Sequence, residues 1–201
     1  MANAACRVVA IEHLTLDGVY QAPACPDEDV RGGFSHGGWG VKDGGDPGLQ
    51  QAMGRQMAGG WSLLVGSTTY DDLYEAWPRR QPSNPMTQAL TNVRKFVASR
   101  DRNRKLPWAN SILLQGEAAA AVAGLKQEHD RTLVIFGSGA LVRSLMGHGL
   151  VDRFLLMIHP LVLGEGLRLF DGGVPPAKLR LVDHSTTDSG VLVATYELVA
   201  G

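Results

Sequence analysis

The sequence predicts an α/β protein with a mixed, mostly parallel central sheet and a C-terminal β-hairpin. Short apolar runs alternate with amphipathic or alanine-rich segments along most of the 201 residues, as in strands that are joined by helical crossovers. The last two apolar runs, residues 179–185 and 191–199, are separated only by residues 186–190, so we expect them to pair as an antiparallel hairpin. The length fits one domain over residues 1–201.

Composition and charge argue against several classes of protein. The net charge is −1 and 44% of the residues are hydrophobic, so no bulk attraction to nucleic acid or to a membrane surface is expected. No apolar run approaches the length of a membrane span. Cys6 and Cys25 form no CxxC motif, and the six histidines show no HExxH or HxxxH pairing, so we expect no metal site. A reducing cytoplasm is the expected compartment.

The expected elements follow in order along the chain. Strands are predicted for residues 6–14, 61–66, 93–99, 110–114, 132–136 and 151–160, with a short continuation at 167–170. Helices are predicted from Asp46-Pro47 to Gly59-Gly60, from residue 67 to Trp77-Pro78, over residues 116–129, and after Gly139 to Gly147 and Gly149. Residues 79–90 and 101–109 are expected to be loops.

The stretch 132–151 carries the clearest functional signal. An apolar run ends at Gly137-Ser138-Gly139, and an amphipathic helix follows. Such a turn places free backbone N–H groups at a helix N-terminus, where the helix dipole favours an anion such as phosphate. A tight strand-to-helix turn also prefers glycine for steric reasons alone, so both interpretations stay open for this motif. It is neither a complete dinucleotide fingerprint nor a P-loop.

Two further strand ends carry groups that suit phosphate. The first consists of Gly66, Ser67, Thr68 and Thr69, at the end of one strand and the start of a short helix. Simple helix capping is the alternative there, because Thr68 and Thr69 also fit capping boxes with Asp71 and Asp72. At the end of strand 93–99, Ser99 and Arg100 could hold a phosphate. Ligands bind at the carboxyl ends of strands in open α/β sheets, and three such ends together favour phosphate binding.

Residues 21–45 form a long segment that is rich in glycine, proline and acidic residues. Loops of this length tend to be functional lids or disordered segments. Phe34 and Trp39 favour a lid that packs over a substrate, and a loose insertion with two anchoring aromatic residues is the alternative. In the helix that begins at Asp46-Pro47, Gln51 and Arg55 lie one turn apart and are candidates for contact with the substrate.

Five segments together resemble the dihydrofolate-reductase-like fold. The closer similarity is to the reductase (C-terminal) domain of the bifunctional riboflavin-biosynthesis deaminase–reductase and its stand-alone bacterial relatives. The segments are LTLDGV (14–19), LLVGSTTYDDL (63–73), VASR (97–100), VIFGSGALVRSLMGHGLVDRF (134–154) and HPLVLGEGLRLF (159–170). The resemblance implies a three-layer sandwich around the sheet and a homodimer.

In that family the cofactor is NADPH, and the resemblance implies its position. The pyrophosphate would lie at residues 66–69 and 137–140, the 2′-phosphate at Ser99 and Arg100, and the nicotinamide along residues 11–14 and the loop to Tyr20. The complete expected cofactor set is His13, Gly66, Ser67, Thr68, Thr69, Ser99, Arg100, Phe136, Gly137, Ser138, Gly139, Ala140 and Leu141.

The resulting hypothesis is an NADPH-dependent reductase. It would transfer a hydride to a small heterocyclic or ribosylaminopyrimidine-like substrate, as a 5-amino-6-(5-phosphoribosylamino)uracil reductase does. Asp17 and then Glu165 are the candidate proton donors, with an Asp-Gly turn and a water-supplied proton as alternatives. The candidate substrate contacts are Tyr20, Phe34, Trp39, Gln51 and Arg55.

Two alternative functions stay open. One is a non-catalytic protein that binds NADPH or another nucleotide, and the other is a pterin or dihydrofolate reductase. Dihydrofolate reductases carry an acidic residue inside the first long helix, and residues 49–55 contain no carboxylate. That absence argues against folate reduction.

Overall fold

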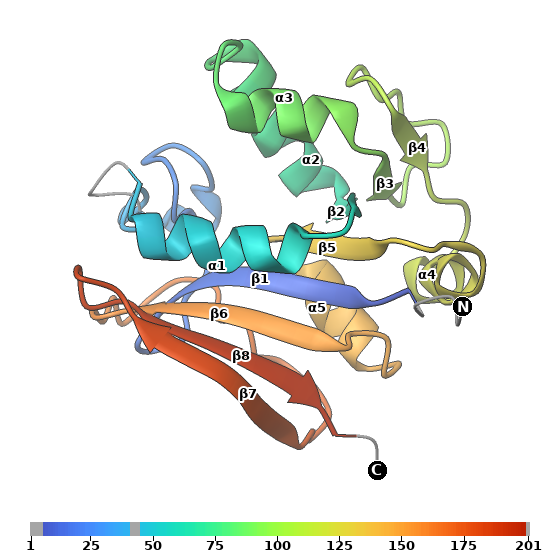
Figure 1. The fold of residues 1–201 in the computed structure, drawn as a ribbon. Helices are drawn as coiled ribbons and strands as arrows, with labels where there is room; N and C mark the ends of the chain where they lie inside the picture. The colour runs from blue at the N-terminus through green and yellow to red at the C-terminus, as the bar shows by residue number, and fades with distance from the viewer. Residues whose placement is uncertain (1–5, 41–44, 200–201) are drawn as a thin grey trace.

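The computed structural model describes residues 6–40 and 45–199, which form one eight-stranded sheet with helices on both faces (Figure 1). The strands are β1 (Val8–Thr15), β2 (Trp61–Gly66), β3 (Lys95–Ala98), β4 (Ser111–Leu113), β5 (Thr132–Phe136), β6 (Arg153–His159), β7 (Leu179–Thr186) and β8 (Leu192–Leu198). Their order across the sheet is β4-β3-β2-β5-β1-β6-β8-β7. Neighbours are parallel from β4 to β6, whereas β8 runs antiparallel to both β6 and β7.

The helices divide between the two faces of the sheet. They are α1 (Pro47–Met57), α2 (Ser67–Tyr74), α3 (Pro85–Asn92), α4 (Ala118–Glu128) and α5 (Gly139–Met146), with short helical turns η1 (Arg31–Gly33) and η2 (Glu75–Arg79). One hydrophobic core lies between the sheet and α4 and α5, and a second lies between the sheet and α1, α2 and α3. The predicted three-layer α/β sandwich of the dihydrofolate-reductase-like type is confirmed, as is the terminal hairpin of β7 and β8.

Strand β1 lies in the middle of the sheet because both of its faces are apolar. Val8 and Ala10 pack in the core on the α5 side, whereas Val9 and Ile11 pack in the core on the α1 side, as the two-residue period of a strand requires. β1 pairs with β6 from Val9 to Thr15 but with β5 only as far as Ile11. β5 ends at Phe136, opposite Ile11, so the last residues of β1 have no neighbouring strand on that side and border a gap at the carboxyl edge of the sheet.

The start of α1 agrees with its sequence signals. Pro47 is the first helical residue, and the Asp46 carboxylate accepts hydrogen bonds from the backbone N–H of Gly48 at 2.8 Å and of Leu49. The carboxylate satisfies donors that have no partner inside the helix. This pair of interactions fixes the N-terminus of α1 above β1 and β6.

Four details of the expected elements were wrong. Residues 85–92 form α3 rather than a loop, with Asn84 capping the first turn. The capping boxes in α2 do not form, since Gly66 is the cap and no side chain bonds the first turn. The following helical turn η2 continues through Pro78 to Arg79. The expected strand at 167–170 is a turn that joins the fold by one bridge between Val19 and Arg168.

The described part of the 21–45 segment packs against the rest of the protein. Phe34 and Trp39 are buried together with Val19 and Ala22 in a small third core. The Trp39 indole N–H donates to the carbonyl of Gln21 at 2.7 Å, so the segment is tied to its own beginning. Positions 41–44 of the expected lid lie outside the described residues. Within the described ranges, no helix has the length and hydropathy that a membrane span requires.

Candidate active site

A large cleft lies along the carboxyl edge of the sheet. Its volume is about 2260 Å³, which exceeds the space that one drug-sized ligand fills and leaves room for a dinucleotide beside a substrate. Its lining includes the ends of β1, β2, β3 and β5, the starts of α1, α2 and α5, and part of the 21–40 loop. It brings together most of the expected site residues: His13, Tyr20, Trp39, Gly66, Ser67, Thr68, Thr69, Ser99, Arg100, Phe136, Gly137, Ser138, Gly139, Ala140 and Leu141.

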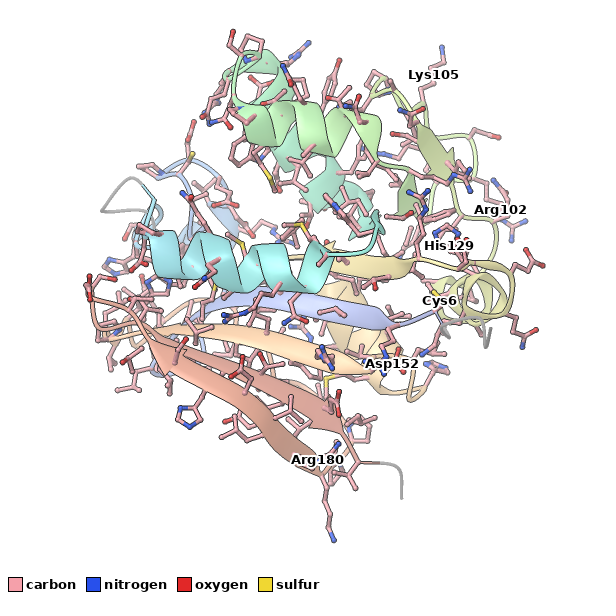
Figure 2. All side chains as sticks on the ribbon, viewed as in Figure 1. Cys6, Arg102, Lys105, His129, Asp152 and Arg180 are labelled. Atoms are coloured by element: carbon pink, nitrogen blue, oxygen red, sulfur yellow. The ribbon has the colours of Figure 1, made fainter. Side chains whose placement is uncertain are left out.

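The opposite edge of the sheet carries structural contacts. Figure 2 shows Cys6, His129 and Asp152 there, near the start of β1 and the end of α4. The Cys6 thiol donates to the carbonyl of Arg131, and Asp152 accepts from the Val8 N–H and from the Lys126 ammonium. The side chains of Cys6 and Asp152 thus join neighbouring chain segments.

Gly66 and Gly137 face open space across the floor of the cleft. A Cβ atom at Gly66 would meet only the Ser138 hydroxyl at 3.9 Å, and one at Gly137 would meet only Thr69 at 3.8 Å. The Ser138 hydroxyl accepts a hydrogen bond from the Gly66 N–H at 3.1 Å and so joins the two strand-to-helix turns. The missing side chains leave a cradle into which a ligand can approach the backbone closely.

The backbone at the start of α5 is shaped for an anion. Gly137 and Ser138 have φ of 57° and 61°, the left-handed region that non-glycine residues rarely adopt and that concentrates at functional sites. The N–H groups of Gly139 and Ala140 have no acceptor within the described chain. The two orphan donors and the helix dipole together favour a phosphate at this point.

Tyr20 closes the start of α5 from above. A Cβ atom on Gly139 would lie 2.4 Å from the Tyr20 ring, so this glycine is required for close packing rather than for its φ angle. The guanidinium of Arg143, one turn along α5, lies 5.8 Å from the centre of the same ring. Tyr20 therefore covers the gap between β1 and α5, on the path that a ligand would follow.

Ser99 and Arg100 follow β3, the strand next to β2. The Ser99 hydroxyl accepts from the Asp101 N–H at 3.1 Å, while Arg100 is exposed and has no ion-pair partner among the described residues. Arg104 on the same loop is already paired with Asp71. An unpaired guanidinium beside a hydroxyl, one strand away from the glycine cradle, fits the extra phosphate that distinguishes NADPH from NADH. The residues present therefore fit this cofactor.

His13 and His159 form a hydrogen-bonded pair on the α1 side of the cleft. His13 Nδ1 lies 2.9 Å from His159 Nε2, and the edge of Trp39 packs on the His159 ring with centroids 5.3 Å apart. Burial and the neighbouring His159 lower the pKa of His13 to about 4. Burial also lowers the pKa of His159, against the opposing effect of Asp46. His13 was expected at the cofactor, whereas the role of His159 could not be expected from a lone histidine at a strand end.

Glu12 is a cleft residue that sequence reasoning missed. It is 1% exposed, and its Oε1 atom has no hydrogen-bond partner among the described residues. Burial raises the pKa of this carboxyl well above its usual range, although Arg143 acts in the opposite direction. A signal was present in the sequence, because Glu12 is the one acidic residue in the predicted strand 6–14.

The expectation that Asp17 donates a proton needs correction. Its carboxylate accepts from the Thr15 hydroxyl at 2.6 Å, from the N–H groups of Leu163 and Gly164, and from Arg168. The Thr15 hydroxyl, assisted by these N–H groups, holds the pKa of Asp17 well below its usual range. Asp17 is outside the cleft lining and joins the loop after β1 to the loop after β6 as an ionised group.

Four other candidates also lie outside the cleft lining. Glu165 pairs with His36 at 3.3 Å on the surface, and Arg55 pairs with Asp183 of β7 at 3.7 Å. Gln51 is exposed. Phe34 is buried in the third core. In each case the side chain is used in another contact or is exposed, and it is not part of the lining of this cleft.

The fold and the cleft define a class of protein: a dihydrofolate-reductase-like α/β domain with a nucleotide-sized cleft at its carboxyl edge. The sequence matches the family model of the RibD C-terminal domain over residues 8–193, and the chain belongs to this family. The uncharacterized protein YyaP of Bacillus subtilis (strain 168) is 30% identical over 142 residues, which cover 67% of this chain and 72% of YyaP.

Solved structures show the same fold at low sequence identity. A protein of Shewanella sp. PV-4, provisionally assigned to riboflavin biosynthesis, gives a TM-score of 0.69 at 17% identity over 96% of this chain and 99% of that chain. The Thermotoga maritima diaminohydroxyphosphoribosylaminopyrimidine deaminase/5-amino-6-(5-phosphoribosylamino)uracil reductase gives a TM-score of 0.61 at 16% identity. The match covers 96% of this chain and 57% of that chain. Enterococcus faecalis dihydrofolate reductase, complexed with NADP(H), gives a TM-score of 0.57 at 12% identity. The match covers 96% of this chain and 97% of that chain.

Proposed function

We propose that this protein is an NADPH-dependent reductase of a small heterocyclic substrate. The observation that carries the proposal is the meeting of two glycine turns at one cradle. Gly66 and Gly137 open onto the same space, and the free N–H groups of α5 border it. Ser99 and Arg100 add a second anion site one strand away. Membership of the RibD C-terminal family and the fold shared with reductases support the same reaction class.

Bound NADPH would supply the hydride. The chain itself would bind and orient the two reactants and limit the access of water. The turns at Gly66 and Gly137 would hold the pyrophosphate, and Arg100 would hold the 2′-phosphate. Because β5 ends opposite Ile11, the last residues of β1 would leave the nicotinamide half a place beside them, near Tyr20.

The substrate would bind on the α1 side of the cleft. Leu49, Met53, Phe136 and Trp39 give this part an apolar lining, and the His13–His159 pair is the polar group among them. Apolar walls with a few placed polar groups suit a flat heterocycle. As the hydride adds to the carbon of a C=N or C=O bond, the π electron pair moves to the nitrogen or oxygen, which takes a proton.

The His13–His159 pair is the best placed proton source. His13 uses Nδ1 for the hydrogen bond to His159, so its Nε2 remains for a ligand. Among the described residues, neither His13 Nε2 nor His159 Nδ1 is a buried atom without a hydrogen-bond partner. Imidazole groups in hydrogen-bond reach of a reacting atom serve as general acids. Since the pKa of His13 is about 4, its ring is neutral at neutral pH. His13 would donate its Nε2 proton to the substrate atom while its Nδ1 takes the Nε2 proton of His159, and His159 would take a proton from solvent at Nδ1, so both rings stay neutral.

A non-catalytic nucleotide-binding protein is the alternative function. The first turn of α1 offers no free carboxylate, since Asp46 is used as the helix cap. A protein that had kept only the cofactor cleft would show the same glycine cradle. A pterin or dihydrofolate reductase is less favoured, because the described part of α1 presents no acid to the cleft.

The test is a titration of the purified protein with NADPH and with NADH, followed by intrinsic tryptophan fluorescence. We expect tight NADPH binding, weaker NADH binding, and at least a tenfold loss of NADPH affinity in Arg100→Ala, because a charged hydrogen bond to phosphate is removed. Lys105→Ala is the matched control: Lys105 extends from the same loop (Figure 2) and is outside the cleft lining.

Absence of binding by either nucleotide would reject the function. Binding without NADPH oxidation in a screen of pyrimidine and pterin acceptors would favour the non-catalytic alternative.

A further inference from the structure

Glu12 is buried without a hydrogen-bond partner on its Oε1 atom, yet it lines the cleft. Buried polar atoms in proteins are almost always satisfied, and each exception calls for a physical reason. A buried carboxyl that no protein group satisfies is costly. Its position on the cleft wall points to a ligand as the missing partner.

The side chain of Glu12 lies on the α5 side of β1. Ala10 and Leu14, two positions away on either side, both pack in the core against α5, and Glu12 shares their face by the period of the strand. The charged group that acts on it is Arg143 of α5. The guanidinium of Arg143 donates to the carbonyl of Arg168 rather than to Glu12. Among residues 6–40 and 45–199 the carboxyl therefore has no ion-pair partner, and burial favours its uncharged, protonated form.

The chain position of Glu12 places it beside the anion cradle. The carbonyl of the preceding residue, Ile11, accepts from the Gly137 N–H at 3.4 Å, and Gly137 is the first residue after the end of β5. Gly139 and the Tyr20 ring cover the same gap from the α5 side. A carboxylate next to a phosphate site would repel the ligand, whereas a protonated carboxyl offers both a donor and an acceptor.

We propose that Glu12 binds the nicotinamide half of the nucleotide as an uncharged carboxylic acid. The ribose hydroxyls and the carboxamide of that half are neutral groups that can both donate and accept hydrogen bonds. The inference rests on the proposed function, because it names a residue for the same nucleotide site. It assigns to β1 a side-chain contact that the glycine turns and Arg100 do not provide.

Glu12 then lowers stability in return for binding. Replacement of an unpartnered buried polar group by an apolar group of similar shape is neutral or stabilising. We therefore expect Glu12→Leu to fold with a melting temperature at least equal to that of the wild-type protein, and to lose affinity for NADPH. A group with a purely structural role would change the melting temperature without changing the affinity.

The experiment compares four proteins by NADPH titration with tryptophan fluorescence and by thermal unfolding. We expect Glu12→Leu to weaken NADPH binding about tenfold, as for the loss of one well-placed hydrogen bond in a dry site. Glu12→Gln keeps a neutral donor and acceptor and should bind within about threefold of wild type. Glu197→Gln is the control, because this carboxylate of β8 bonds to Arg153 and Arg180 and is outside the cleft lining.

The same proteins give a second readout when the pH is varied. Ionisation of Glu12 at rising pH should weaken binding to the wild type, by at most about tenfold per pH unit, but should leave Glu12→Gln unaffected. The dissociation constant of the wild type is divided by that of Glu12→Gln at each pH. This ratio cancels the effect of the titration of the nucleotide's own phosphates, which is the same for both proteins. The other groups near Glu12 are Arg143 of α5 and Tyr20 of the following loop, and both are present in the two proteins.

The outcomes separate the two proposals. If the wild type binds NADPH and Glu12→Leu binds it equally well, the role of Glu12 is rejected while the proposed function stands. Equal loss of binding in Glu12→Gln and Glu12→Leu, with no change in the pH dependence, also rejects the uncharged-acid role. If the wild type binds neither nucleotide, both proposals fail.

Discussion

At the scale of single residues, β1 supplies two uncharged polar groups to opposite sides of one gap. Glu12 faces α5 and His13 faces α1, because consecutive residues of a strand point to opposite faces. Burial raises the pKa of the Glu12 carboxyl and lowers the pKa of the His13 imidazole. Both shifts favour the neutral form of the side chain. A strand with both faces buried can thus carry ionisable residues without net charge.

The His13 pKa makes stability depend on pH in a defined window. Its folded-state pKa is about 4, and an unfolded histidine titrates near 6.5. Between these values the unfolded chain binds more protons, so the free energy of unfolding falls as the pH falls from about 6.5 toward 4, by at most about 1.4 kcal/mol per pH unit for one group. Above about pH 6.5 the His13 ring is neutral in both states, so it no longer lowers the free energy of unfolding.

Urea unfolding at several pH values between 7.5 and 4.5 tests this dependence. The wild-type protein should lose stability more steeply than His13→Asn, which removes one titrating member of the pair. His159 remains in the variant and keeps part of the slope, since burial lowers its pKa as well. Identical slopes in the two proteins would show that His13 binds its proton with the same pKa in the folded and the unfolded state.

The sequence could predict the glycine turns but not their neighbours. Residues 137–139 were identifiable because the left-handed φ at Gly137 and the close approach of Tyr20 to Gly139 restrict the residue type. Glu12 and His159 belong to the site through contacts between strands that are distant in the chain. Asp17 looked like an acid near the nicotinamide, but four hydrogen-bond donors, from the end of β1 and from the loop after β6, keep it ionised.

At the scale of elements, α3 depends on one buried lysine. Lys95, the first residue of β3, donates to the carbonyls of Leu90, Thr91 and Val93 at 2.7 to 3.1 Å. Its ammonium also lies 4.7 Å from the centre of the Trp108 ring, a favourable cation–π arrangement. The last carbonyls of a helix have no partner inside the helix, and Lys95 satisfies them from below.

Replacement of this lysine should destabilise the protein without a change in the cleft. Lys95→Met keeps the apolar stem but removes the side-chain donor to the carbonyls of Leu90 and Val93, whereas that of Thr91 still accepts from Asn110. We therefore expect a loss of about 2–4 kcal/mol in the free energy of unfolding, measured in urea. Lys105→Met, on the exposed loop between β3 and β4 (Figure 2), should change stability by less than about 0.5 kcal/mol. Equal effects of the two changes would contradict the role of Lys95.

The same helix shows why elements differ in how well a sequence predicts them. α1 and α3 begin with the same signal, an Asx residue followed by proline: Asp46-Pro47 and Asn84-Pro85. α1 has an apolar face long enough to be recognised, whereas α3 has eight residues, of which only Thr87 and Leu90 are buried. Its end is set by Lys95, whose contact with the helix cannot be inferred from periodicity.

At the scale of the whole molecule, the sheet order required more than local patterns. Alternating elements predicted a mostly parallel sheet, but β1 pairs with β5 and β6, and β2 with β5, which are distant along the chain. Before the structure, only the resemblance to the dihydrofolate-reductase-like fold pointed to a particular arrangement of the strands. The edges of the sheet are also unequal: β4 has three residues, whereas β7 has eight and is exposed along most of its length.

The long edge at β7 leads us to expect a homodimer. A long, exposed edge strand presents unpaired backbone groups and is usually covered, and Leu181 and Val182 of β7 are 47% and 39% exposed. A second copy of the chain would cover them by pairing along the hairpin. Light scattering should then give twice the 21.5 kDa of one chain, and Leu181→Lys should give monomers because it places a charge in the contact. Ile112→Lys, at the exposed opposite edge on β4, is the matched control and should stay dimeric. A monomeric wild type, or a dimer that survives Leu181→Lys but not Ile112→Lys, would rule out this interface.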